Sequence, residues 1–145
     1  MNRGNQVFQF RPAWDLSVYF DGACPLCMRE VNYYRRHDNS GHIRWVDIAA
    51  PDFDAVEEGL DPKRVHEVMH VKNYRGRVYT ELDAFLAIWR VLPRQRKWRF
   101  LKIIVRTPGI YWLLTKLYRL FARNRYRLTG RCRNGDCTIT PHQPA

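Results

Sequence analysis

Apolar and polar residues alternate at residues 16–20, LSVYF, in the period-two pattern of a β-strand. The spacing then changes, because Cys27, Val31 and Tyr34 follow i, i+4 and i+7 and so share one face of a helix. A second segment rich in apolar residues, at residues 43–48, predicts another strand. The first unit is therefore β-α-β, and a helical crossover of this length implies two parallel strands.

The next apolar segments predict two more strands and a second helix. Residues 65–71 and 77–79 favour strands, with hairpin composition at residues 73–76 between them. Apolar residues at helical spacing over 82–92 then predict a helix that ends at Pro93. This second unit is β-β-α.

Two amphipathic helices are predicted beyond Pro93, over residues 97–106 and 110–124, with a break at Thr107-Pro108-Gly109. The net charge of +11 belongs to this part of the chain. Residues 94–133 hold 13 Lys and Arg and no Asp or Glu. No uncharged run here approaches the roughly 20 residues that a membrane span requires.

Three interpretations of the basic helices follow. The favoured one is that they cover the sheet or the first helix and leave a basic face in solvent. The second is docking on an anionic membrane surface through Trp98, Tyr111 and Trp112 with their basic neighbours. Nucleic-acid binding is the least favoured, because a basic patch alone is not a readout motif.

The candidate chemistry lies where the first strand meets the first helix, at Cys24-Pro25-Leu26-Cys27. Pro25 suits the first helical position, and Asp21-Gly22 before it is a turn signal. The helix N-terminus favours the thiolate of Cys24, which we expect to be the exposed attacking thiol, with Cys27 less exposed as the resolving thiol. Asp21 is interpreted first as a turn former and second as a proton shuttle for Cys27.

A β-α-β unit followed by β-β-α, with C-x-x-C at the first strand–helix junction, predicts an α/β thioredoxin-like three-layer fold. We expect an irregular lead-in at residues 1–14, a thioredoxin-like domain at 15–93, and a basic helical extension with a cysteine-containing tail at 94–145, packed on the same domain. Such enzymes carry a cis-proline immediately before the third strand, whereas the nearest proline here is Pro62.

The segment Asp21-Gly22-Ala23-Cys24-Pro25-Leu26-Cys27 resembles the D-G-x-C-x-x-C signature of the DCC family of thiol–disulfide oxidoreductases. Further matches run in the same order and extend the resemblance from Leu16 to Cys137. They are residues 43–47, 69–71, 83–85 and 122–126. The resemblance implies a glutaredoxin- or thioredoxin-like fold, with Cys24 and Cys27 as the catalytic pair.

Two other groups of residues could carry chemistry. Cys132 and Cys137 could form a second redox pair, be ordinary tail thiols, or form a loop disulfide on oxidation. They could also complete a four-cysteine zinc module with Cys24 and Cys27. His66-Glu67-Val68-Met69-His70 matches H-E-x-x-H, but that motif needs a helix, and on the expected strand the two imidazoles lie too far apart. We therefore expect no metal.

The favoured interpretation is a thiol–disulfide oxidoreductase of the protein-disulfide reductase type. It requires no cofactor beyond an external electron donor, such as a thiol or a reductase system, and its substrate is a protein or small-molecule disulfide. The first fifteen residues lack a secretory signal, so the expectation is a cytoplasmic location, with peripheral association with a membrane as a second option. The alternatives are the zinc module and a membrane- or nucleic-acid-associated adaptor with a thioredoxin-like core.

Overall fold

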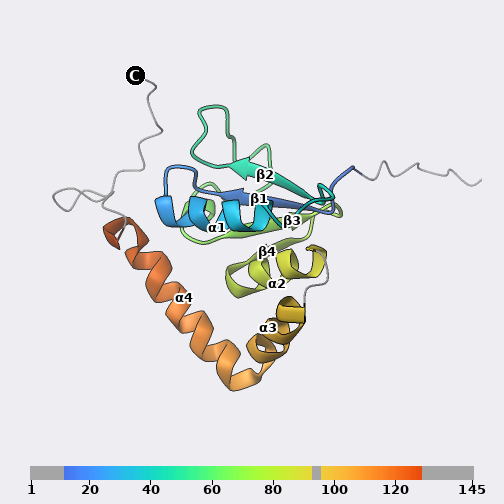
Figure 1. Cartoon of the computed structure of the whole chain (residues 1–145). Coiled ribbons are helices and arrows are strands. Elements are labelled where there is room, and N and C mark those ends of the chain that lie inside the picture. The colour runs from blue at the N-terminus through green and yellow to red at the C-terminus, as the bar shows by residue number, and fades with distance from the viewer. Residues whose placement is uncertain (1–11, 93–95, 129–145) are drawn as a thin grey trace, which may run out of the picture.

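The computed structural model describes residues 12–92 and 96–128, in which a four-stranded sheet is packed with four α-helices (Figure 1). The strands lie in the order β2-β1-β3-β4. This mixed α/β architecture is consistent with the predicted thioredoxin-like fold. Residues 1–11 of the predicted lead-in, together with Cys132 and Cys137, lie outside the described residues.

The first unit has the predicted β-α-β form. Strand β1 (Leu16–Phe20) pairs in parallel with β2 (Ile43–Asp47), with Leu16 opposite Ile43. Helix α1 (Pro25–Arg35) connects them and buries Val31 and Tyr34, two residues of the predicted inward face.

The second unit differs from the prediction at its start. Strand β3 (His70–Asn73) pairs antiparallel with β1 and with β4 (Val78–Thr80), so the predicted hairpin is confirmed. The predicted strand at residues 65–71 is wrong in its first half, where a short 3-10 helix, η1 (Arg64–His66), forms instead. The reason is local, because the Asp61 carboxylate accepts hydrogen bonds from the N–H groups of Lys63 and Arg64 and holds this segment in a turn.

The two faces of the sheet are covered differently. On one face, residues of α1, α2 (Glu81–Val91) and α3 (Arg96–Arg106) form the main core. On the other face, Tyr19 packs against residues of the segment that follows β2, including Ile48, Leu60 and Val65. That segment is mostly turns, so the third layer of the fold is irregular chain and η1 and contains no α-helix.

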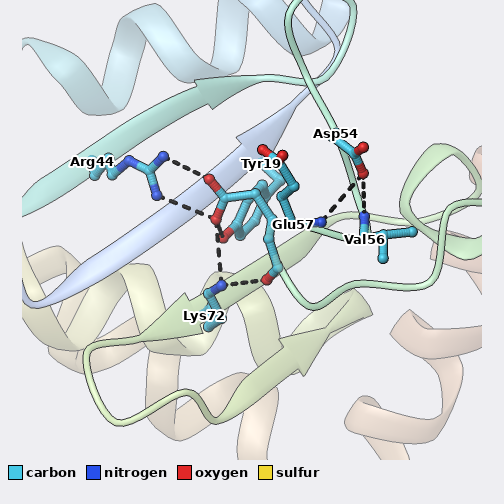
Figure 2. A network of polar contacts seen from close by, with 7 residues as sticks. Tyr19, Arg44, Asp54, Val56, Glu57 and Lys72 are labelled. Carbon is cyan, nitrogen blue, oxygen red and sulfur yellow. Dashed lines mark hydrogen bonds and ion pairs between the residues drawn. The ribbon is translucent and has the colours of Figure 1, made fainter.

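A charged network joins the irregular layer to the sheet. The Glu58 carboxylate accepts a hydrogen bond of 2.6 Å from the Tyr19 hydroxyl and a bidentate pair from the Arg44 guanidinium at 2.6 and 3.2 Å. Lys72 donates to the backbone carbonyl and the carboxylate of Glu58 (Figure 2). Since Tyr19, Arg44 and Lys72 come from β1, β2 and β3, this one carboxylate ties three strands to the segment that covers them.

Helix α4 (Pro108–Leu128) follows α3, and the two form a V beside α2 (Figure 1). Trp98 anchors α3, because it is buried and stacks on Trp89 of α2 with ring centroids 5.7 Å apart. Trp98 therefore belongs to the core, and its predicted part in membrane docking is wrong. None of the helices described is long and apolar enough to cross a bilayer.

Candidate active site

The turn between β1 and α1 is held by two carboxylates. Asp21 Oδ1 accepts a hydrogen bond of 3.0 Å from the N–H of Ala23, so Asp21 is the turn former that the sequence predicted. Asp47, at the end of β2, accepts a hydrogen bond of 2.8 Å from the N–H of Gly22. A Cβ atom on Gly22 would lie 1.9 Å from Asp47 Oδ2, so any larger residue would force this carboxylate to shift from its hydrogen bond to the Gly22 N–H.

Cys24 follows this turn as the N-cap residue of α1, with Pro25 as the first helical residue. Its Sγ accepts a hydrogen bond of 3.3 Å from the backbone N–H of Cys27. The pKa of Cys24 is lowered, first by a hydrogen bond from the Cys27 side chain and then by this N–H, against the effect of burial. The Asp21 charge raises the same pKa and the Arg125 charge lowers it. The predicted activation of Cys24 at a helix N-terminus therefore has a definite geometry.

Cys27 has the opposite electrostatics. Its pKa is raised, chiefly by its hydrogen bond to Cys24 and by burial, so its thiol stays protonated while Cys24 carries the charge. Both cysteines are free thiols.

The predicted order of exposure is wrong. Cys24 is only 1% exposed, whereas Cys27 is partly exposed. The cause is the capping contact itself, because Cys24 turns its sulfur back over the start of the helix to accept the N–H of Cys27.

A cavity of about 230 Å³ opens beside Cys27. Its walls come from β1 and the turn after it, from α1, α2 and α4, and from the segment between β2 and β3. They include Asp21, Cys27, Glu30, Val65, Val68, Met69, Phe85, Tyr118, Phe121 and Arg125. Most of this lining is apolar, so the partly exposed thiol faces a largely apolar pocket.

Arg125 is one of the residues of this site that sequence reasoning did not identify. It lies in the last turns of α4, is 7% exposed, and donates a hydrogen bond to the backbone carbonyl of His66. Its positive charge lowers the pKa of both thiols. The available signal was that Arg125 lies in residues 122–126, the last segment that resembles the DCC family.

Glu30 and Tyr118 complete the polar part of the cavity and were also missed. The Tyr34 hydroxyl donates to Glu30 at 3.0 Å and accepts from the Trp89 indole at 3.1 Å, while burial raises the pKa of Glu30. The Tyr118 hydroxyl accepts a hydrogen bond of 2.8 Å from the N–H of Met69, the residue immediately before β3. A side chain of α4 thus binds the backbone where thioredoxin-like enzymes carry their cis-proline.

Pro62, His66 and His70 are not among the residues that line this cavity. Pro62 is exposed, and the described residues contain no cis peptide bond. His66 is in η1 and His70 begins β3, so the H-E-x-x-H sequence is not on one α-helix. Within residues 12–92 and 96–128, no group of three or more His, Cys, Asp or Glu side chains could hold a metal ion.

Comparison with known proteins gives one family and two relatives. A family model described as DCC1-like thiol-disulfide oxidoreductase matches residues 18–131. An uncharacterized chloroplastic protein of Arabidopsis thaliana is 33% identical over 120 residues, which are 81% of this chain and 54% of the relative. The uncharacterized protein YuxK of Bacillus subtilis (strain 168) is 25% identical over 124 residues, which are 84% of this chain and 85% of the relative. No solved structure matches. This chain therefore spans about half the length of the Arabidopsis protein.

Proposed function

Because the chain belongs to the DCC1-like thiol-disulfide oxidoreductase family, we propose that its Cys24-Pro25-Leu26-Cys27 segment is a redox-active dithiol that reduces disulfides. The observation that carries the proposal is the position of Cys24 at the N-cap of α1, where its Sγ accepts the backbone N–H of Cys27 at 3.3 Å. The pKa values of the two thiols shift in opposite directions across this helical turn. A thiolate is the nucleophile in thiol–disulfide exchange, so the charge on Cys24 makes it the attacking residue. Exposure alone would favour Cys27 as the attacking residue, but a thiol that keeps its proton is a poor nucleophile.

The proposed reaction has two steps. The Cys24 thiolate attacks one sulfur of the substrate disulfide, forms a mixed disulfide, and releases the other sulfur as a thiolate that takes a proton from solvent. Cys27 then loses its proton and attacks Cys24 Sγ, which releases the second substrate thiolate and leaves a Cys24–Cys27 disulfide. Two electrons have passed from the dithiol to the substrate, and an external thiol or reductase system returns them.

Cys27 needs a proton acceptor for the second step, and Glu30 is the proposed one. It lies one turn further along α1, lines the same cavity, and has a pKa that burial raises. The Tyr34 hydroxyl holds its carboxyl group in place.

The substrate in this proposal is a protein or small-molecule disulfide. In a reducing compartment such as the cytoplasm, the ambient thiol pool keeps the pair reduced, so it acts mainly as a reductant. The redox activity needs only the two thiols and an electron donor.

A disulfide-reduction assay tests the proposal in a Cys132→Ser/Cys137→Ser background, which removes the two other thiols. Cys24→Ser should abolish turnover. Cys27→Ser should instead accumulate a mixed disulfide on Cys24 that dithiothreitol releases. Activity of Cys24→Ser equal to that of its background would contradict the proposal.

A further inference from the structure

Helix α4 carries two apolar faces. One face, with Tyr118 and Ala122, packs on the domain and contributes to the wall of the cavity. The other carries Leu113, Leu117 and Leu120, which are 52%, 53% and 59% exposed. Their spacing of four and three places them on one stripe of the helix. The favoured interpretation, a cover with a basic face in solvent, does not account for this exposed apolar stripe.

Basic side chains border the leucine stripe. Lys116, Arg123 and Arg127 are exposed and lie along one edge of it. Trp112 is 60% exposed, and its ring has the Lys116 ammonium 3.9 Å from its centroid. Arg119, by contrast, is paired with Glu81 of α2 at 3.1 Å.

We propose that the outward face of α4 docks on the surface of an anionic lipid bilayer. The helix lies in the plane of the interface, with Leu113, Leu117 and Leu120 at the boundary between headgroups and acyl chains and the basic edge among the headgroups. A tryptophan beside a lysine is well suited to that depth, because its ring is apolar and its N–H is polar. The proposal goes beyond the redox function and does not depend on it.

The charge of the segment favours lipid over two other occupants. Residues 94–133 hold 13 basic residues and no acidic one, so a second copy of this face would be repelled. Nucleic acid offers phosphates but no apolar layer to cover three exposed leucines. An anionic bilayer surface matches both the apolar stripe and its basic edge.

Binding of the full chain to lipid can be measured by flotation with two kinds of vesicle, one of phosphatidylcholine alone and one with phosphatidylglycerol added. The proposal expects binding that requires phosphatidylglycerol and weakens as salt is raised. Leu113→Ser/Leu117→Ser/Leu120→Ser should reduce binding by about tenfold or more, because it removes the inserted apolar surface. The matched control is Val56→Ser, which removes an apolar side chain that is 69% exposed on the opposite layer of the fold, and it should bind like the wild type.

Circular dichroism and thermal melting of each variant separate a lost docking surface from a lost fold. A second variant, Lys116→Gln/Arg123→Gln/Arg127→Gln, keeps the leucines and should also weaken binding, with a shallower dependence on salt. The proposal is overturned if phosphatidylglycerol vesicles bind no protein, or if the folded leucine variant binds them like the wild type. It is also overturned if the wild type is a dimer that binds vesicles and the leucine variant is a monomer that does not. The stripe would then hold two copies of the chain together.

Discussion

At the scale of single residues, Cys24 and Cys27 share a helical turn but differ in charge because each is the other's main hydrogen-bond partner. These contacts lower the pKa of Cys24 to about 6 and raise that of Cys27. We expect the alkylation rate of Cys24 to rise with pH around that value, well below the midpoint of about 8.5 for a free cysteine. Iodoacetamide kinetics across pH, in the Cys132→Ser/Cys137→Ser background, measure it.

Two variants should shift the midpoint of this titration in opposite directions. Cys27→Ala removes the largest stabilising contact, so the midpoint should rise. Asp21→Asn removes a negative charge and keeps the oxygen that holds the turn, so the midpoint should fall. Shifts in the reverse directions would contradict the assignment of these contacts.

Gly22 is the second residue whose role can be tested directly. Gly22→Ala places a methyl group against the Asp47 carboxylate and displaces the hydrogen bond that holds the turn. We expect the free energy of unfolding to fall by about 1–3 kcal/mol, the usual cost of overpacking. Urea denaturation measures it, with Gly109→Ala as the control, because no atom lies within 4 Å of a Cβ there. An equal loss in both variants would remove the special role of Gly22.

At the scale of elements, period and turn chemistry predicted β1, α1, β2 and the β3–β4 hairpin, because each depends on residues close in sequence. Strand β3 was placed too early, since Val65 and Val71 are both buried but in different clusters, and alternation does not distinguish them. The helical period of α4 was predicted, but not which of its apolar faces contacts the domain. That choice depends on packing against segments far away in sequence.

The network around Glu58 predicts how stability depends on pH. Hydrogen bonds, first from Arg44 and then from Tyr19 and Lys72, lower the pKa of Glu58 to about 2. A carboxyl group with a lowered pKa in the folded state stabilises fully above its unfolded value of about 4.3 and loses this contribution as pH falls toward 2. The free energy of unfolding should therefore decrease over this window.

Glu58→Gln should lower the free energy of unfolding by about 1.5–3 kcal/mol at pH 7, the usual value for hydrogen bonds to a charged group. It should also reduce the dependence on pH below about 4.3. Glu57→Gln is the matched control, because this neighbour is exposed, and its profile should follow the wild type. Parallel profiles for Glu58→Gln and the wild type would contradict the stated role of the network.

At the scale of the whole molecule, α4 joins the site to the basic extension through Arg125. Arg125→Met should raise the pKa of Cys24, because the guanidinium lowers it, whereas Arg125→Lys should keep part of the effect. The same alkylation profiles measure this, with Arg123→Met, an exposed position on α4, as the control. A similar shift in Arg123→Met would show that net charge, and not the position of Arg125, is responsible.

The two cysteines and their turn could be predicted from sequence because spacing and turn residues define them locally. Arg125 could not, since its role depends on a contact with His66 across 59 positions of chain. Glu30 looked like an ordinary helical residue until Tyr34 and the cavity gave it a partner and an environment. Burial of a charged side chain is a property of the assembled fold, and no local pattern reports it.

The distance along the chain between the thiols and Arg125 also determines when each is available during synthesis of the protein. The cysteines leave the ribosome roughly a hundred residues before Arg125, which is several seconds or more at about 5–20 residues per second. Throughout that interval the nascent chain exposes both thiols without the guanidinium that favours the thiolate. The thiol of Cys24 is therefore less acidic, and less reactive, while the nascent chain leaves it exposed. It reaches its full acidity only once α4 has been synthesised and has packed on the domain.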